Sequence, residues 1–284
     1  MGTTTPIVNA MTVDVEEYFH ATAVQAVVPP ARWESLESRI ERSTQSVLDV
    51  FAEHRVHGTF FVLGWAAERH PGLVRRIAEA GHEIASHGYA HQLVYDQSPD
   101  EFRRDVTRAK QFLEDTTGSR VDGYRAPTFS ITTRSLWALD VLAEAGYRYD
   151  ASIFPIHHDR YGIPGSPRGI HDRPANGGTL LEWPGSTVRV LGANVPFAGG
   201  GYFRLLPYSV IRWATRRLHA QDRDAAIFYI HPWEFDPGQP RQPLPWLSAA
   251  RHYVNLERTE TRFRRLLKDF QFAPVRDLLW AART

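Results

Sequence analysis

Apolar and polar positions follow two alternating spacings along the chain, one typical of strands and one of helices. Short apolar runs that predict buried strands occupy 7–13, 58–63, 82–86, 121–125, 147–151 and 225–230. Apolar residues recur every three or four positions, as on one face of a helix, over 40–54, 73–80, 99–112, 134–145, 208–219 and 256–270. Because strands and helices alternate, we predict an α/β fold built on a parallel sheet.

Turn and capping residues set several element limits. Ser98 opens a capping box with proline at the next position, so a helix should begin at Pro99. Glycines at 81 and 146 are expected to end the helices that precede them. Residues 155–178 are rich in Pro, Gly and His and are expected to form a long surface excursion. The runs 179–183 and 187–191 are expected to pair as a hairpin.

Polar side chains stand at or just beyond the carboxyl ends of five predicted strands. They are Asp14, His87, Arg125, Asp150 and His231. In a barrel of parallel strands those ends meet at one mouth, which is where barrel active sites form. We therefore predict a single site to which all five segments contribute.

Composition narrows the function classes. The chain has 284 residues, 43% of them hydrophobic, which suits two small domains or one barrel. Its formal net charge is +1, so nucleic acid is not an expected partner. It has no cysteine, so any metal ion would need histidine and carboxylate ligands. We recognise no secretory signal or membrane span and expect a cytoplasmic protein.

A metal site is the first chemical candidate. His87 and His91 are four residues apart, and on a helical turn this spacing lets both imidazoles reach one ion. An acid from the sequence Asp-Val-Glu at 14–16 would complete a set of two histidines and one carboxylate, with positions open to water. Asp14 and Glu16 can face the same side of an extended strand. The alternative is a pair of solvated acids.

Three further candidates each have two interpretations. Arg125 would hold a catalytic carboxylate through a bidentate clamp, or form a surface ion pair. Asp150 would raise the basicity of a histidine, or be an ordinary turn acid. His231 would act as a general acid beside a metal, or be a structural histidine with satisfied hydrogen bonds.

Five ordered segments resemble the motifs of the polysaccharide deacetylases (the NodB-like domain, carbohydrate esterase family 4). The segments are Thr12–Glu16, Ser86–His91, Arg125–Pro127, Tyr149–Ser152 and Tyr229–His231. The resemblance implies a distorted (β/α) barrel with seven or fewer repeats. It also implies a divalent metal ion, zinc or alternatively cobalt.

The later part of the chain resembles one branch of that family, the deacetylases associated with exosortase (PEP-CTERM) loci. The segments that carry this likeness are 199–208, 231–237 and 251–260. This resemblance implies a deacetylase domain over 1–240. It further implies a helical extension over 241–284 that packs on the barrel.

The resemblance to the family gives each candidate residue a role. It implies Asp14 as catalytic base, His87 and His91 as metal ligands, Arg125 as the residue that orients the base, His231 as general acid and Asp150 as the partner of that acid.

Three departures from the family pattern bear on these roles. Asp-Val-Glu replaces the usual adjacent pair of aspartates, so Glu16 is expected as the third metal ligand; if it points away, Asp14 would bind the metal instead. Gly88 replaces a Ser or Thr that often braces the histidine loop, so that support is missing or comes from elsewhere. Thr128 and Phe129 replace Tyr-Gly, but a backbone N–H there would still serve an oxyanion.

The resemblance implies metal-dependent removal of acetyl groups from N-acetylated amino sugars of a bacterial polysaccharide, oligosaccharide or precursor. Thr128, Tyr202 and Trp233 are expected to contact this glycan substrate, although the tryptophans, Trp183 included, could equally pack in the core. The alternatives are hydrolysis of another small amide or ester, and a catalytically silent carbohydrate-binding module. Retention of both proton-transfer residues argues against silence. The sequence names neither the glycan nor the oligomeric state.

Overall fold

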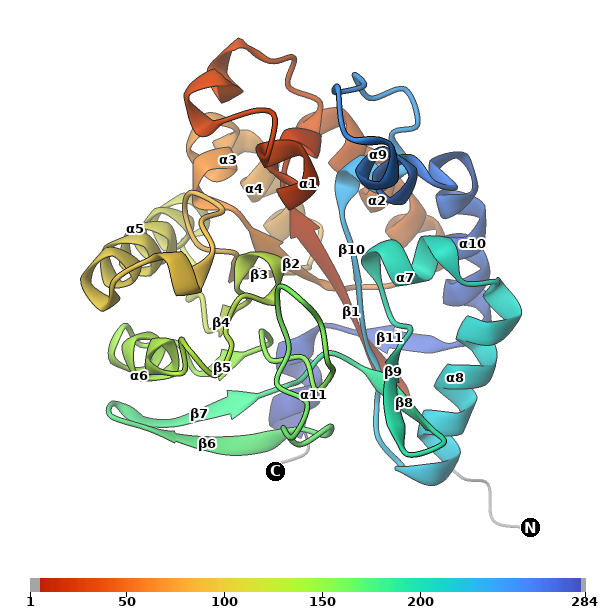
Figure 1. Cartoon of the computed structure of the whole chain (residues 1–284). Coiled ribbons are helices and arrows are strands. Elements are labelled where there is room, and N and C mark those ends of the chain that lie inside the picture. The colour runs from red at the N-terminus through yellow and green to blue at the C-terminus, as the bar shows by residue number, and fades with distance from the viewer. Residues whose placement is uncertain (1–5, 282–284) are drawn as a thin grey trace.

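The computed structural model describes residues 6–281 and shows a curved, mostly parallel sheet with helices ranged around it (Figure 1). The strand order is β10-β1-β2-β3-β4-β5-β7-β6. The bounds are β1 (Val8–Val15), β2 (Thr59–Val62), β3 (Glu83–Ser86), β4 (Gly123–Tyr124), β5 (Tyr149–Asp150), β6 (His171–Ala175), β7 (Gly178–Glu182) and β10 (Ile227–Ile230). Neighbours from β10 to β7 are parallel, whereas β6 pairs antiparallel with β7. This curved sheet with helices around it confirms the predicted distorted barrel. The barrel is open, because the ordered path of strands ends at β10 on one side and at β6 on the other.

Another strand comes from the C-terminal segment. Within β1, Ala10 pairs with Ile227 of β10 and also with Ala273 of β11 (Gln271–Ala273). A strand has only two edges, so β11 lies on the side of β1 that β2 occupies further along. The expected helical extension over 241–284 therefore also supplies a strand to the sheet.

Helices cover the outside of the sheet. The longer ones are α2 (Ile40–His54), α4 (Pro71–Glu79), α5 (Pro99–Thr117), α6 (Trp137–Glu144), α8 (Tyr208–Gln221), α9 (Trp246–Tyr253) and α10 (Leu256–Asp269). The shorter ones are α1 (Thr22–Gln25), α3 (Gly64–Arg69), α7 (Gly200–Leu205), α11 (Val275–Ala281) and the 3-10 turns η1 (Tyr18–His20), η2 (Pro30–Ser35), η3 (Val94–Asp96), η4 (Pro127–Phe129) and η5 (Pro232–Phe235). The predicted limits of α2 are confirmed, and α5 begins at Pro99 with the Ser98 side chain accepting from the Glu101 amide.

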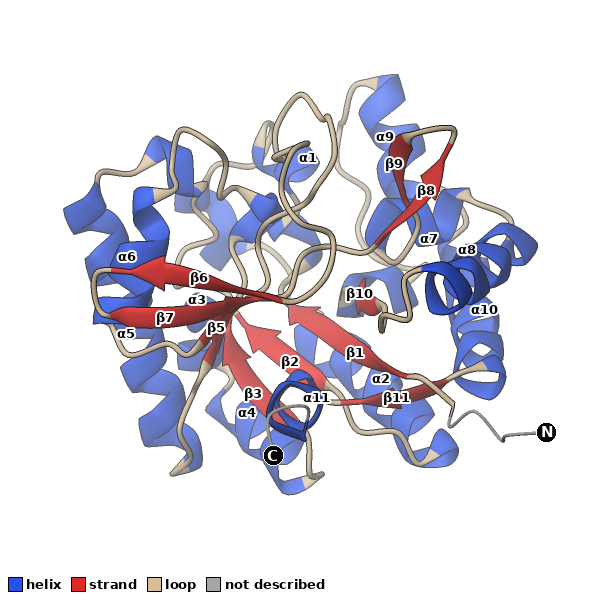
Figure 2. Ribbon diagram, turned by 90° about the horizontal axis from the view of Figure 1, so that it is seen from below, coloured by secondary structure: helices blue, strands red, loops and turns tan. Residues whose placement is uncertain are grey.

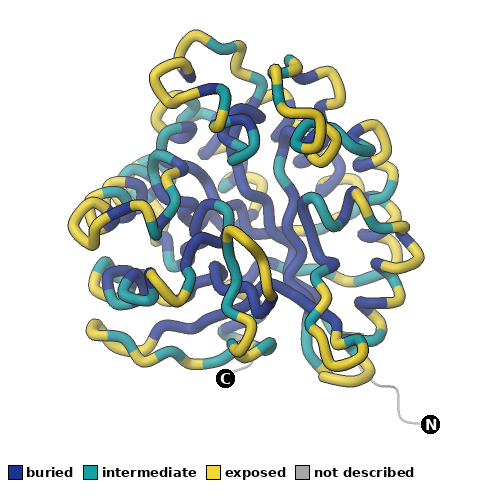
Figure 3. Tube along the Cα trace, in the orientation of Figure 1, coloured by how far each residue is buried: buried dark blue, intermediate teal, exposed yellow. Residues whose placement is uncertain are grey.

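Two apolar layers pack against the sheet, one on each side. The strands are therefore the most buried part of the chain (Figure 3). In β2, Phe60 points to the layer under the helices, and the next residue, Phe61, points to the barrel interior with Tyr149 and Trp183. Leu279 of α11 joins this interior cluster, and Figure 2 shows α11 beside the amino ends of the strands. The C-terminal helix therefore closes the barrel interior at the amino ends of the strands, and the carboxyl ends remain open for a site.

The predictions for 155–191 are partly wrong. The expected hairpin between 179–183 and 187–191 does not form; β7 pairs with β6 and β5, and β8 (Thr187–Val190) pairs with β9 (Ala193–Pro196). The surface excursion is an irregular loop only as far as residue 170, because β6 occupies its last part. Among residues 6–281, no helix is long and apolar enough to cross a bilayer.

Candidate active site

A pocket of about 200 Å³ opens at the carboxyl ends of the strands; we call it the rim pocket. Its lining includes five predicted catalytic or metal-binding residues, which lie at or just after the ends of three separate strands, namely Asp14, Glu16, His87, His91 and His231. Arg125 follows β4 and lies beneath the pocket, in contact with Asp14. Parallel strands have therefore brought together segments that are far apart in the sequence, as the strand-end argument predicts.

Glu16, His87 and His91 form the candidate metal site. One ligand atom from each lies within 4.8 Å of the others, and all three residues are buried. Glu16 faces the same side as Asp14 because it is two residues further along the extended chain. Both acids therefore point into the pocket, as expected, and the idea of a solvated pair is wrong.

The histidine loop is not the helical turn that the four-residue spacing suggests. Residues 87–91 form an irregular loop after β3, with positive φ at Gly88 (72°) and His91 (50°). The carboxylate of Asp105 on α5 braces it by accepting from the amides of Tyr89 (2.8 Å) and Ala90 (3.1 Å). A Cβ at Gly88 would lie 2.8 Å from Asp105 Oδ1. The support expected from a Ser or Thr thus comes from Asp105.

The donor atoms suit a divalent cation. His87 Nδ1 is 2.8 Å from the Arg125 carbonyl, a contact that assigns the proton to Nδ1 and leaves the Nε2 lone pair for a metal. Burial is the main cause that lowers the pKa of His87, to about 4, so the ring is neutral at neutral pH. Glu16 Oε2 lies 2.7 Å from His91 Nε2. None of the described residues donates a hydrogen bond of normal geometry to this carboxylate oxygen. A buried carboxylate oxygen without a donor fits a cation ligand.

Glu16 and His91 are held from outside the metal site. The indole N–H of Trp233 donates to Glu16 Oε1 at 3.0 Å, and Gln25 Nε2 lies 2.9 Å from His91 Nδ1. Burial raises the pKa of Glu16, but the neighbouring histidines, His91 first, hold it well below its ordinary value. The carboxylate is therefore ionised at any pH at which a metal would bind.

Asp14 has a different partner. Arg125 Nη1 donates to Asp14 Oδ1 and to Thr12 Oγ1, each at 2.7 Å, and its guanidinium lies 4.2 Å from the centre of the Phe61 ring. The pair is buried, so the surface interpretation of Arg125 is wrong. A single guanidinium nitrogen makes the contact, so the expected bidentate clamp is also wrong. Asp14 Oδ2 remains on the pocket side, 3.9 Å from His231 Nε2.

His231 is paired with Glu234, not with Asp150 as expected. Glu234 Oε2 lies 3.3 Å from His231 Nδ1 and also accepts from the His231 amide at 2.9 Å. Its other oxygen accepts from Arg204 Nε at 2.6 Å. Burial lowers the pKa of His231, but Glu234, with smaller contributions from Glu16 and Asp14, raises it to about 9. The ring is therefore protonated at neutral pH.

Asp150 supports the backbone beneath the pocket instead. It accepts a hydrogen bond from the hydroxyl of Ser152, which in turn accepts from the Ala126 amide at 2.8 Å. Burial raises the pKa of Asp150, and burial together with the charge of Asp150 raises that of the neighbouring Glu182 well above its ordinary value. These contacts fix the segment that follows Arg125.

The expected sugar-contacting residues fall in different places. Thr128 lines the rim pocket with φ of 56°, unusual for a β-branched residue, and its hydroxyl is 2.5 Å from that of Thr22. Trp233 also lines the rim pocket, but it is buried and its ring stacks with the rings of His231 and His252, with centroid distances of 5.0 and 4.5 Å. Tyr202 hydrogen bonds to Tyr161, which lines the pocket in its place, and Trp183 is a core residue.

Sequence reasoning missed five residues that support the site. They are Gln25, Asp105, Tyr161, Arg204 and Glu234. Only Glu234 had a local signal, because it stands three residues after His231 and caps the turn that His231 opens. The other four contact the site through the tertiary fold.

Comparison with known proteins agrees with this architecture. Residues 34–149 match the family model "Polysaccharide deacetylase", and residues 151–280 match a domain of unknown function (DUF3473). Residues 34–149 carry a polysaccharide deacetylase domain. The first range contains His87, His91 and Arg125, whereas His231, Glu234 and Arg204 lie in the second. The exosortase-associated branch stays a prediction.

Curated relatives of the deacetylase domain match over part of their length. The peptidoglycan-N-acetylglucosamine deacetylase of Bacillus cereus is 35% identical over 98 residues, 34% of this chain and 36% of that protein. The chitooligosaccharide deacetylase of Rhizobium leguminosarum bv. trifolii is 35% identical over 115 residues, 40% of this chain and 49% of that protein. The matched stretches thus span less than half of either relative.

Solved structures share the fold of the deacetylase domain over almost the whole chain. A Mycobacterium smegmatis protein assigned to the polysaccharide deacetylases superposes with a TM-score of 0.62 at 23% identity, covering 98% of this chain and 94% of that one. The peptidoglycan deacetylase PdaC of Bacillus subtilis gives a TM-score of 0.51 at 14% identity, covering 97% and 91%. At these identities the likeness concerns the fold.

Proposed function

We propose that this protein is a divalent-metal-dependent hydrolase that removes acetyl groups from N-acetylated amino sugars. The observation that carries the proposal is the separation of two carboxylates in one pocket. Glu16 lies among the two histidines, while Asp14, two residues away, is held by Arg125. One acid would thus bind the metal and the other would accept a proton.

Glu16, His87 and His91 would hold the cation, zinc or cobalt. A divalent cation there would supply Lewis-acid polarisation of the acetyl carbonyl and of a water molecule. The three protein ligands leave coordination positions open toward the rim pocket, where substrate and water can enter.

Asp14 is the proposed general base. Arg125 engages Oδ1 and so orients the carboxylate, while Oδ2 faces the pocket and is free to accept a proton from the attacking water. The buried position of the pair strengthens this contact, because little water competes with it.

His231 is the proposed general acid. Its Nε2 points toward Asp14 and Glu16, at 3.9 and 4.0 Å, and so toward the position of the reacting amide. Glu234 keeps the ring protonated and fixes its orientation through Nδ1. The proton on Nε2 can pass to the amine as the C–N bond breaks, which an amide needs because a free amide anion is a poor leaving group.

The substrate class follows from the pocket and from the relatives. A pocket of about 200 Å³ has room for one sugar unit but not for a longer chain. Gly200, Gly201, Thr128 and Tyr161 contribute to its lining, so hydroxyl groups are available there to a sugar. The relatives named above act on peptidoglycan N-acetylglucosamine and on chitooligosaccharides, which supports an N-acetylglucosamine-type unit here.

Acetate release tests the proposal. The purified chain is stripped with a chelator, reloaded with zinc or cobalt, and assayed on chitooligosaccharides. We expect activity only in the reloaded protein. His87→Ala should lose both metal and activity, Asp14→Asn should keep metal but lose activity, and His54→Ala, on α2, should change neither. Full activity of the stripped protein, or full metal content in His87→Ala, would overturn the proposal.

A further inference from the structure

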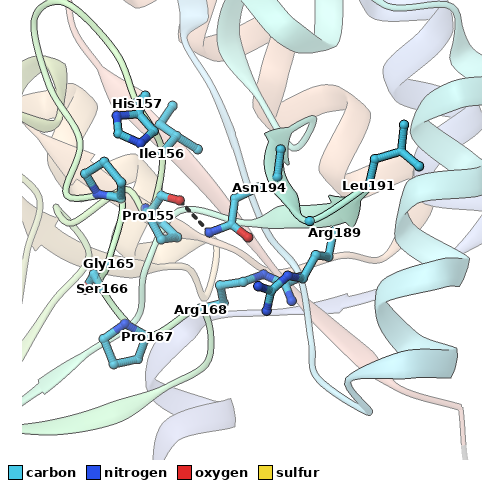
Figure 4. A pocket seen from close by; sticks show the side chains of 13 residues that line it. Pro155, Ile156, His157, Gly165, Ser166, Pro167, Arg168, Arg189, Leu191 and Asn194 are labelled. Carbon is cyan, nitrogen blue, oxygen red and sulfur yellow. Dashed lines mark hydrogen bonds between the residues drawn. The ribbon is translucent and has the colours of Figure 1, made fainter.

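A second and larger cavity lies beside the rim pocket. We call it the outer groove: a space of about 900 Å³ between the loop 155–168 and the hairpin formed by β8 and β9 (Figure 4). Asn194 of β9 joins the two walls by donating to the Pro155 carbonyl at 2.8 Å. This hydrogen bond fixes the hairpin relative to the loop, so the groove is part of the fold.

One thin wall separates the outer groove from the rim pocket. Ile156 lines the groove and belongs to a small apolar cluster with Phe129 and Tyr229, both of which line the rim pocket. Tyr161 also packs on this cluster and lines the rim pocket. A polymer whose reacting unit occupies the rim pocket can therefore continue over this wall into the groove.

The groove is positively charged. Arg168 extends from the loop and is fixed by the Thr187 carbonyl at 2.7 Å and by Asp222 at 2.8 Å. Arg189 extends from the opposite wall, on the same face of the hairpin as Asn194, its partner in the register, and it is exposed (Figure 4). Neither an Asp nor a Glu is among the described residues that line the groove. No carboxylate among these lining residues therefore balances the positive charge of Arg189.

We propose that the outer groove binds the units that flank the reacting sugar, and that Arg189 pairs with their acidic groups. This makes an acidic, N-acetylated polysaccharide strand the substrate class, and it rests on the proposed deacetylase function. A guanidinium without a protein partner can form a bidentate contact with a carboxylate. A neutral glycan would leave that capacity unused.

Binding measurements test the groove without requiring turnover. The probes are a hyaluronan hexasaccharide, which alternates N-acetylglucosamine with glucuronate, and chitohexaose, its neutral counterpart, titrated calorimetrically into the metal-loaded protein. We expect tighter binding of the acidic probe, weakened by added salt. Arg189→Glu should weaken binding of the acidic probe by roughly ten-fold or more and change chitohexaose little. Arg75→Glu, an exposed arginine on α4, is the matched control and should change neither.

The outcomes separate the two proposals. Equal binding of both probes by the unaltered protein, or an equal effect of Arg189→Glu on both, overturns the groove proposal whatever the activity. Failure to release acetate from any probe would overturn the proposed function instead. Hydrolysis of para-nitrophenyl acetate should be the same in Arg189→Glu and the unaltered protein, which would place the defect outside the rim pocket.

Discussion

Replacing Glu234 with glutamine tests the source of the proton on His231. Glu234 contacts His231 Nδ1 at 3.3 Å and Arg204 Nε at 2.6 Å through different oxygens. Burial raises the pKa of Glu234, but Arg204 and His231 lower it to about 2, so it is a permanent negative charge. Glutamine has the same shape and can still accept a hydrogen bond, yet it carries no charge.

The expected loss of activity in Glu234→Gln follows from the protonated fraction of His231. With a pKa of about 9, about 99% of the ring is protonated near pH 7 and about half near pH 9. Burial by itself lowers the pKa of His231, and Glu234 is the main group that raises it. The smaller contribution of Glu16 would be offset by a bound cation. If the pKa returns to about 6.5, the fractions become roughly 24% and 0.3%.

The basic limb of the pH–rate profile should therefore move to lower pH by about two and a half units. The acid is active when protonated, so its activity is present below the pKa and lost as the pH rises through it. We expect Glu234→Gln to slow amide hydrolysis about four-fold near pH 7 and on the order of 100-fold near pH 9. The same carboxylate balances Arg204, and an unpaired buried charge costs about 3–5 kcal/mol of unfolding free energy, so thermal melts accompany the assay.

The assay measures initial rates of acetate release from chitotetraose across this pH range, with an aryl acetate in parallel. The aryl leaving group needs no proton, so the shift of the basic limb should be absent with that ester. Glu83→Gln is the matched control, because Glu83 is a buried carboxylate at the start of β3, at the opposite end from the site. An equal loss near pH 6 and pH 9, or the same shift with the ester, would refute the role assigned to Glu234.

Three further predictions concern the supports of the metal site, each measured as metal affinity by chelator competition. Gly88→Ala should abolish binding, because its Cβ would lie 2.8 Å from Asp105 Oδ1 at a φ of 72°, whereas Gly118→Ala, with φ of 64° and open space, should bind normally. Gln25→Ala should weaken binding about ten-fold by freeing the ring of His91; unchanged affinity would contradict this. Trp233→Phe should have a similar effect, since it removes the donor to the third ligand, and a lost fold rather than lost metal would argue against it.

The position of the site could be predicted from the sequence, because it depends on topology. Once the chain alternates strands and helices, the ends of parallel strands share one edge, and polar residues placed there must meet. Asp14 and Glu16 could be assigned to one side because a strand has a period of two. The helix Ile40–His54 could be bounded because its apolar stripe is continuous.

Contacts that depend on the path of a loop could not be predicted. The four-residue spacing of His87 and His91 fits a helix, but positive φ at His91 places both rings on one ion site from an irregular loop. Asp150 and Glu234 are both carboxylates near strand ends, and only the turn after β10 decides which one reaches His231. Sequence likewise gives the aromatic character of Trp233 but not the two histidine rings that stack with it.

The two matched sequence ranges meet within one sheet and one candidate site. The polysaccharide deacetylase match at 34–149 contains the two proposed histidine ligands, but β1, with Asp14 and the adjoining Glu16, precedes it. The range of unknown function supplies β10, which pairs with β1 over four register positions, and His231, which directly follows β10.

That second range also holds the support of the proposed acid. Arg204 binds Glu234 and donates to the carbonyls of His252 and Val254, at 2.7 and 3.1 Å, so the segment after residue 240 positions the charge that keeps His231 protonated. A fragment ending at residue 149 would leave one edge of β1 without β10 and the opposite edge, at its start, without β11. It would also leave Asp14, the proposed base, without His231, the proposed acid. The region of unknown function is therefore, in structural terms, the second half of the site.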